Sequence, residues 1–362
     1  MKPHHAFSLL IFASLAVYAI TPAREAACAD PVAGAPISAR VERIGLTVAD
    51  LENSLSFYTQ VLGFEPVGEI REVWGAAYEQ LHGVFGLRMR IARLKLGDEH
   101  IELFEYLAPK GRPVPPDTRS NDLWFQHLAI IVSDMPAAYT RLRAHRVTHA
   151  STGPQILPAW NPAAGGIEAF YFRDPDGHHL ELLRFPKGKG HAKWQRQDAL
   201  FLGIDHTAIV VSDTEASLAH YRDRLGLRVV GTSENYGTEQ EHLNNVYGAR
   251  LRITALRAAT GPGIELLEYL APRDGRRLPI DSRPNDLTHW QITIVTNGPV
   301  ERAITALSDG RGPARYRVTE LGPDAAGGFT RSFLATDPDG HVTQWIQEEG
   351  VDLNGALETD KR

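Results

Sequence analysis

An internal repeat that runs through most of the chain constrains the fold more than any other feature. The sequence EYLAP at residues 105–109 returns at residues 268–272, and DPDGH at residues 174–178 returns at residues 337–341. Both pairs are 163 residues apart, so the spacing between the two motifs is the same in both copies. A long duplication with a nearly constant offset predicts two similar domains joined in tandem.

Each half is in turn a repeat of a smaller unit that begins with an apolar strand and a helix. In the first unit, Asp50 is placed to cap a helix whose apolar face carries Leu51 and Tyr58, and Gly63 is placed to end it. Three further strands follow near residues 65–72, 88–95 and 100–106. The same opening strand recurs in four segments, RIGLTVAD (43–50), FQHLAIIVSD (125–134), FLGIDHTAIVVSD (201–213) and WQITIVTNG (290–298). The sequence therefore predicts an α+β fold of four βαβββ modules.

These repeats set the expected division of the chain. The second module includes a strand at 125–132, a helix at 135–144 and a tight turn at Asp174-Pro175-Asp176-Gly177. The predicted parts are a first domain over residues 41–186, a basic linker over 187–199, a second domain over 200–348 and a polar tail over 349–362.

The first residues have the composition of a targeting segment. Lys2 and two histidines precede an apolar run over residues 6–20, which is too short to span a bilayer comfortably, and Ala27-Cys28-Ala29 offers a cleavage signal. We expect a signal peptide over residues 1–29 and a periplasmic or secreted protein that is not membrane-bound after cleavage. An uncleaved anchor is the alternative, and Glu25 disfavours a lipoprotein.

Composition narrows the chemistry further. With 43% hydrophobic and 23% charged residues the chain is globular, and a net charge of -6 argues against nucleic-acid binding. Cys28 is the single cysteine and would leave with the signal peptide. Any metal ion in the mature chain would then have to be held by histidine and carboxylate groups.

Two histidines and two glutamates are candidates for such a role. His127 and His206 stand near the head of apolar strands, and the alanines two places on, Ala129 and Ala208, leave the same strand face open. Glu181 and Glu265 share their strand faces with apolar side chains, where an unpaired carboxylate would be costly. Taken singly, each histidine could instead be a core residue with satisfied hydrogen bonds, and Glu265 could be a carboxylate on an edge strand.

The four modules together resemble the vicinal oxygen chelate superfamily, which includes glyoxalase I, methylmalonyl-CoA epimerase, extradiol dioxygenases and bleomycin-binding proteins. The motifs that carry the resemblance are the Val-x-Asp after the first strand, the Leu-Gly-Phe or Leu-Gly-Leu that closes the helix, and the final Ile-Glu-Leu or Leu-Glu-Leu strand. The resemblance covers about residues 41–348 and implies two glyoxalase-like domains with curved mixed sheets. It also implies two ligand positions in each module, which are Arg43 and Glu102, His127 and Glu181, His206 and Glu265, and Gln291 and Gln344.

The resemblance allows two ways of pairing the modules. If consecutive modules paired, each domain would have a site with a damaged ligand set. If the second module paired with the third, His127, Glu181, His206 and Glu265 would form one complete set. The remaining site would then contain every substitution, and Arg43 could pair with Glu102 there. We expect the second arrangement, with one divalent Zn, Ni, Co, Fe or Mn ion per chain.

The predicted function is that of a metal-dependent lyase, isomerase or epimerase acting through an enediolate on a small oxygenated substrate, as a monomer. The resemblance implies that a metal-bound glutamate is also the base, and we expect Glu181 in that role before Glu265. The alternatives are an extradiol-type dioxygenase and a metal-free binding protein. Arg90 and Arg252 could face a substrate anion or form a solvated strand face. Four further histidines, His178, His179, His242 and His341, are expected in loops or turns.

Overall fold

The computed structural model describes residues 36–308, 316–322, 325 and 328–347. The predicted signal peptide and polar tail lie outside these residues. No helix in the described part of the chain has the length and apolar character needed to cross a membrane.

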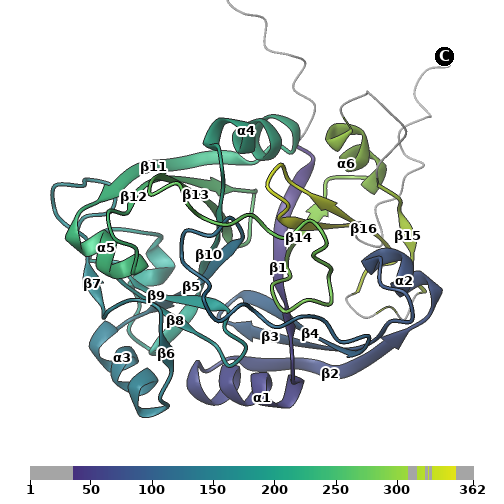
Figure 1. Ribbon diagram of the computed structural model, residues 1–362, viewed down its shortest axis with the longest axis horizontal. Helices are drawn as coiled ribbons and strands as arrows, with labels where there is room; N and C mark the ends of the chain where they lie inside the picture. The colour runs from purple at the N-terminus through teal and green to yellow at the C-terminus, as the bar shows by residue number, and fades with distance from the viewer. Residues whose placement is uncertain (1–35, 309–315, 323–324, 326–327, 348–362) are drawn as a thin grey trace, which may run out of the picture. The chain divides into compact units, whose positions relative to one another are not determined.

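The first half of the chain forms two modules of the expected kind (Figure 1). The first module consists of β1 (Ser38–Val48), α1 (Leu51–Ser56) with its π-helical continuation η1 (Phe57–Val61), β2 (Glu65–Trp74), α2 (Ala76–His82), β3 (Arg88–Leu96) and β4 (Glu99–Ala108). The second consists of β5 (Phe125–Val132), α3 (Met135–Ala144), β6 (Thr148–His149), β7 (Gln155–Ile156), β8 (Glu168–Arg173) and β9 (His179–Arg184).

The second half repeats this order. A short 3-10 helix, η2 (Ala192–Gln195), precedes the third module, which consists of β10 (Phe201–Val210), α4 (Thr214–Leu218), η3 (Ala219–Arg224), β11 (Arg228–Tyr236), α5 (Thr238–Asn244), β12 (Arg250–Arg257) and β13 (Gly263–Ala271). The fourth consists of β14 (Trp290–Thr296), α6 (Val300–Leu307), β15 (Thr319–Glu320), β16 (Arg331–Thr336) and β17 (Val342–Gln347).

Local sequence signals explain where the main helices begin. The side chains of Asp50, Asp134 and Asp213 each accept a hydrogen bond from a backbone N–H in the first turn of α1, α3 and α4, as expected of helix caps. Gly63 adopts a φ of 75° after the first of these helices, a backbone conformation that favours glycine. The two short helices α2 and α5 were not predicted from the sequence.

The strand order shows which modules pair. One sheet has eight strands in the order β15-β16-β17-β14-β1-β4-β3-β2, and the other has nine, with β11-β12-β13-β10-β5-β9-β8-β6 as its main path. The third module therefore lies beside the second, through antiparallel β10 and β5, and the fourth lies beside the first, through β14 and β1 (Figure 1). This confirms the expected pairing across the two halves, and pairing of consecutive modules is wrong. We call the two units the 1–4 sheet and the 2–3 sheet.

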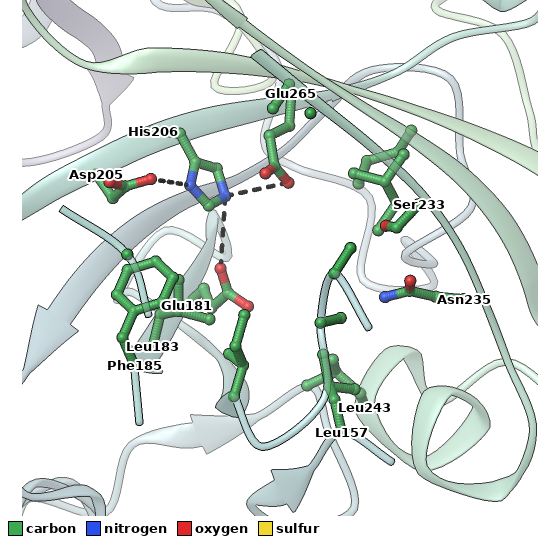
Figure 2. A pocket seen from close by; sticks show the side chains of 18 of the residues that line it. Leu157, Glu181, Leu183, Phe185, Asp205, His206, Ser233, Asn235, Leu243 and Glu265 are labelled. Atoms are coloured by element: carbon green, nitrogen blue, oxygen red, sulfur yellow. Dashed lines mark hydrogen bonds and ion pairs between the residues drawn. The ribbon is translucent and has the colours of Figure 1, made fainter. Parts of the chain in front are cut away.

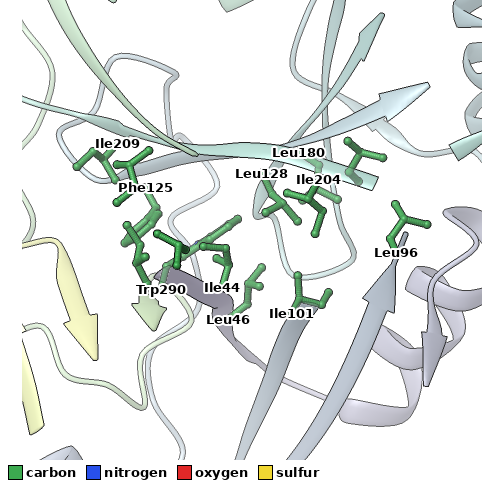
Figure 3. Packing of buried hydrophobic residues seen from close by; sticks show 14 of the residues in the cluster. Ile44, Leu46, Leu96, Ile101, Phe125, Leu128, Leu180, Ile204, Ile209 and Trp290 are labelled. Carbon is green, nitrogen blue, oxygen red and sulfur yellow. The ribbon is translucent and has the colours of Figure 1, made fainter. Parts of the chain in front are cut away.

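The two sheets share one hydrophobic core. Figure 3 shows Ile44, Leu46 and Ile101 of the 1–4 sheet opposite Leu128 and Ile204 of the 2–3 sheet. These side chains are at most 1% exposed, and burying each stabilises the fold by roughly 1.5–3 kcal/mol. The opposite faces of the sheets are free to carry a site.

The motif Asn-Asp-Leu occurs at residues 121–123 and again at residues 285–287, and it has a structural role. Arg112 forms an ion pair with Asp286 at 2.6 Å, and Arg276 forms the equivalent pair with Asp122, also at 2.6 Å. Each arginine also donates its backbone N–H to the same aspartate. These reciprocal contacts join the segment after β4 to the segment after β13, and so hold the two halves of the chain together.

Candidate metal centre

The four predicted ligands come together in the 2–3 sheet. His127 lies on β5, Glu181 on β9, His206 on β10 and Glu265 on β13, which are four adjacent strands. His127, Glu181 and His206 are buried, and 23% of the Glu265 side chain is exposed. One module could not have supplied this set, because two of the strands come from each half of the chain.

The separations between the donor atoms suit a metal ion. His127 Nε2 lies 3.2 Å from His206 Nε2 and 3.2 Å from Glu181 Oε2, and the third separation, between Glu181 Oε2 and His206 Nε2, is 3.7 Å. Two donors that bind one ion at about 2.1 Å with tetrahedral or octahedral angles are roughly 3.0–3.5 Å apart. His127, Glu181 and His206 therefore form a group that can hold a divalent cation.

Glu265 lies beside this group rather than within it. Its Oε2 atom is 3.4 Å from His206 Nε2, but the group whose donor atoms all lie within 4.8 Å of one another contains three residues and does not include it. Figure 2 shows the carboxylates of Glu181 and Glu265 on two sides of the His206 ring. The geometry thus separates one carboxylate that is close to both imidazoles from one that is more open to the cavity.

Irregular strand pairing brings a polar residue to the far side of each imidazole. The β5–β10 ladder has register shifts that leave Gln126 and Asp205 without a directly paired residue, and such bulges re-aim side chains. Asp205 Oδ2 lies 3.0 Å from His206 Nδ1, and Gln126 Oε1 is a hydrogen-bond partner of His127 Nδ1. An acceptor at Nδ1 favours the tautomer that leaves Nε2 free to bind a metal ion.

Asp205 is itself held in place by two partners. The indole N–H of Trp194 and the guanidinium of Arg257 each donate to its carboxylate at 2.7 Å. Trp194 belongs to η2, so the segment predicted to be a linker contributes a buried residue to the support of the site.

The electrostatics of the site favour a cation. Burial alone would lower the pKa of His206, but the negative charges of Glu265 and Asp205 outweigh it and raise that pKa to about 9. Burial, with nearby Glu181, also raises the pKa of the Tyr171 hydroxyl, and the Tyr171 ring lies 5.0 Å from the His127 ring. The carboxylates therefore stabilise positive charge at this point of the sheet.

A cavity of about 360 Å³ opens directly beside these residues. Its volume lies in the range of small-molecule sites. Part of its wall is apolar, as the alternation along β9 and β13 predicts. Leu183 and Phe185 line the cavity with Glu181 (Figure 2), and Leu267 lines it with Glu265. A segment over residues 157–167 and the strand β11 form much of the remaining wall.

The 1–4 sheet places different groups at the equivalent positions. Arg43 forms an ion pair with Glu102 at 2.7 Å, as expected from the sequence, and Gln291 donates a hydrogen bond to Gln344 at 2.9 Å. All four side chains are buried. The Arg43 guanidinium also lies 5.6 Å from the centre of the Phe329 ring. A fixed side-chain cation occupies the neighbourhood of Glu102 in this sheet.

Other candidate residues lie away from the cavity. Arg90 pairs with Glu105 and Arg252 with Glu268, and neither lines the cavity beside the histidines. The interpretation that they face a substrate anion is therefore not supported.

The four further histidines have mixed positions. His178 and His341 follow their Asp-Pro-Asp-Gly turns and pair with Asp174 and Asp337. His179 is the first residue of β9, and His242 lies in the unpredicted helix α5, so the expectation of loop or turn positions is wrong for these two.

Several residues of the site were missed from the sequence. Gln126 and Asp205 directly precede the two predicted histidine ligands, and this adjacency was the available signal. Trp194 and Arg257 gave no such signal, because their contact with Asp205 depends on the folded arrangement of η2 and β12.

Comparison with known families gives the class of the protein. Residues 40–182 and 203–344 each match the Glyoxalase/Bleomycin resistance protein/Dioxygenase superfamily. The chain belongs to this superfamily and contains two copies of its domain. This agrees with the four-module fold and with the resemblance noted in the sequence.

One protein of known activity and two solved structures are similar to this chain. A 2-epi-5-epi-valiolone epimerase from Actinomyces sp is 35% identical over 160 residues, which cover 43% of this chain and 84% of that protein. Glyoxalase I from Zea mays has a TM-score of 0.53 at 16% identity, covering 85% of this chain and 92% of that one. A putative dioxygenase from Bacillus subtilis subsp. subtilis str. 168 has a TM-score of 0.53 at 15% identity, covering 87% of each chain. At these identities the two structures show a shared fold.

Proposed function

We propose that this protein is a metal-dependent isomerase or epimerase that acts on a small hydroxy carbonyl compound through an enediolate. The observation that carries the proposal is the meeting of two imidazoles and a carboxylate, with a second carboxylate beside them, at the wall of a cavity. The name of the epimerase relative agrees with this reaction class. A superfamily that also includes dioxygenases and binding proteins does not by itself specify the reaction.

The residues have distinct roles in this proposal. His127, His206 and Glu181 hold one divalent metal ion, which polarises the carbonyl oxygen and stabilises the negative charge of an enediolate when it is bound. Asp205 and Gln126 keep the two imidazoles in the required tautomer. The donor set contains no sulfur and suits Zn, Ni, Co, Fe or Mn.

Glu265 is the base that we favour. The resemblance favoured Glu181, but the side chain of Glu181 is 5% exposed and lies close to both histidines. The side chain of Glu265 is 23% exposed and faces the cavity. A base must reach a carbon-bound proton of the substrate. The more open carboxylate is better placed for that task.

The proposed step is a proton transfer at the carbon next to the carbonyl. The Glu265 carboxylate accepts the proton, the electrons of the broken C–H bond form the carbon–carbon double bond, and the carbonyl becomes an oxyanion. Return of a proton to the other face of the same carbon gives the epimer. Return of a proton to the former carbonyl carbon gives the isomer, while the neighbouring hydroxyl passes its proton to the oxyanion and becomes the new carbonyl. No oxidant is consumed.

Proton exchange in deuterated water tests this proposal. The full chain loaded with Zn²⁺ or Mn²⁺ is incubated with an uncharged hydroxy ketone, and NMR measures deuterium uptake next to the carbonyl. We expect the wild type to exchange this proton and a chelator to abolish the exchange. Glu265→Gln should lower the exchange rate by at least about a hundredfold. Glu181→Gln should lower both the exchange rate and the amount of bound metal. Consumption of oxygen with catechol, without any exchange, would instead indicate a dioxygenase.

We also propose that the protein is exported and cut after Ala29. The support comes from the basic start, the apolar run over residues 6–20 and the small residues before Asp30. Intact mass of the exported protein should correspond to a chain that begins at Asp30. A mass that includes Met1 would overturn this proposal.

A further inference from the structure

We propose that Asn235 and Gln240 bind hydroxyl groups of the substrate, and that the cavity takes an uncharged, hydroxylated compound. This inference rests on the proposed function, because both amides line the cavity that contains the candidate metal ligands. It names residues of β11 and α5 that the metal centre itself does not use.

Asn235 presents a hydrogen-bond donor to the cavity. The side-chain oxygen of Asn161 accepts from the backbone N–H groups of Ala163 and Ala164, so its nitrogen is the donor in the 2.7 Å bond to Asn235 Oδ1. This order leaves Asn235 Nδ2 without a partner among the described residues. Figure 2 shows the amide nitrogen of Asn235 directed into the pocket, on the same strand as Ser233.

Gln240 presents an acceptor. Its side-chain nitrogen donates to Asn244 Oδ1, and the nitrogen of Asn244 donates to the Tyr269 hydroxyl at 2.7 Å. This chain of bonds fixes Gln240 Oε1 as an acceptor, and within the described part of the chain this oxygen is buried with no hydrogen-bond partner. A buried acceptor without a donor costs free energy, and a substrate hydroxyl would supply the donor.

The other sheet provides an internal comparison. Val73 pairs with Met89 on β2 and β3, just as Asn235 pairs with Leu251 on β11 and β12. Tyr78 is the third residue of α2, as Gln240 is of α5. The 1–4 sheet thus carries a buried valine and a tyrosine at the places of the two amides. The amides occur in the sheet that also contains the two histidines, which links them to the site rather than to the fold.

The charge of the cavity argues against an anionic substrate. Of the described residues that line it, Lys189 is the one lysine or arginine. Its ammonium group donates to the carbonyl oxygens of Pro162, Ala163 and Gly165 at 3.1, 3.0 and 2.9 Å, and an ammonium group has three N–H donors. The carboxylates of Glu181 and Glu265 add negative charge. Outside the candidate metal centre, a phosphate or carboxylate group would therefore find no cationic side chain with a free N–H donor among the described residues that line the cavity.

Binding of two related ketones tests the inference. The probes are scyllo-inosose, a ring ketone with five hydroxyl groups, and 2-hydroxycyclohexanone, which has one. Calorimetry with the full zinc-loaded chain should give a Kd at least about tenfold lower for scyllo-inosose. Asn235→Asp, which keeps the acceptor for Asn161 but removes the donor, and Gln240→Met should each raise that Kd about tenfold. Neither should change the Kd for 2-hydroxycyclohexanone by more than about twofold.

Controls separate recognition from folding. Glu234 lies on β11 with Asn235 but does not line the cavity, so Glu234→Gln should leave both Kd values unchanged. Thermal melting checks that each variant is folded. Equal affinities of the wild type for the two ketones, no binding of either, or variants without effect would overturn the inference. Tighter binding of D-fructose 6-phosphate than of D-fructose would also overturn it.

The same experiment distinguishes the two proposals. If scyllo-inosose binds with the expected pattern but its carbon-bound protons do not exchange in deuterated water, the proposed function fails and the inference stands. If exchange occurs but neither amide affects binding, the inference fails and the proposed function stands.

Discussion

The 2–3 sheet and the 1–4 sheet have nearly the same strand order but place different partners beside the glutamate at one equivalent position. In the 1–4 sheet, Glu102 pairs with the guanidinium of Arg43. In the 2–3 sheet, Glu265 occupies the equivalent position and faces His206. A guanidinium carries its charge permanently and cannot be a ligand. The 1–4 sheet therefore contains a permanent cation as one of its own side chains, whereas the 2–3 sheet contains groups that can bind a cation.

The largest expected difference between the sheets is in activity and metal content. His127→Ala should remove bound metal and lower the rate of proton exchange by at least about a thousandfold, because a ligand of the ion is lost. Gln291→Ala, at the matching position of the 1–4 sheet, should leave both unchanged. Elemental analysis and NMR exchange measure the two quantities. Loss of metal from the Gln291→Ala variant would contradict the assignment of the metal site to the 2–3 sheet.

The second prediction concerns stability. Arg43→Met should lower the free energy of unfolding by about 1–3 kcal/mol, because Glu102 loses its buried partner. Arg93, whose Nη2 lies 2.9 Å from Glu102 and whose side chain is 27% exposed, remains to compensate part of the charge. The double variant Arg43→Met/Glu102→Leu should recover most of this loss, since no buried charge remains. Urea denaturation measures both. A single variant as stable as the wild type would show that the ion pair does not stabilise the 1–4 sheet.

The third prediction tests the support of the metal ligands. Asp205→Asn should weaken metal affinity about 10–100-fold while the fold persists, because the carboxylate beside Nδ1 of His206 is lost. Glu42→Gln is the matched control, since Glu42 precedes Arg43 as Asp205 precedes His206. Metal titration should find no change for the control. Equal affinities of the Asp205→Asn variant and the wild type would exclude this role.

The smallest expected effect concerns the histidine–aspartate pair at the Asp-Pro-Asp-Gly turn, which both sheets contain. Burial alone would lower the pKa of His178, but Asp174 outweighs it and raises that pKa to about 9. A raised folded-state pKa stabilises the protein fully below the unfolded value of about 6.5, and this contribution is lost as pH rises through 9. The free energy of unfolding should therefore fall over this range, and His178→Asn should flatten the curve. A wild-type curve that does not fall between these pH values would contradict the assignment.

Much of the fold was predictable because its signals are local. Asp50, Asp134 and Asp213 mark the starts of helices through their own side chains, and the repeat fixed the number of modules. The ligand positions followed from the resemblance, and the sorting of histidine and glutamine between modules predicted the pairing that the strand order confirms.

The residues that were missed act through contacts that are distant in sequence or irregular in geometry. Asn235 lies on a largely exposed strand without a clear alternation of apolar residues, so nothing in the sequence indicated that it faces the cavity. Gln240 becomes informative because its nitrogen donates to Asn244, whose own nitrogen donates to the Tyr269 hydroxyl. Asp205 supports His206 through a bulge, which a regular alternation of strand faces does not predict.

The pairing of β5 with β10 has a consequence for cooperativity. The two homologous halves of the sequence look like independent domains, yet each completes its sheets with strands from the other half. If the halves were separated, β1 would lose its partner β14 and β5 would lose its partner β10. Both strands, which now lie in the interior of a sheet, would become edge strands. An ion bound by His127 and Glu181 from one half and His206 from the other would stabilise both halves at once by mass action. The duplicated chain is therefore expected to unfold as one unit, with the metal acting as a link between its two copies.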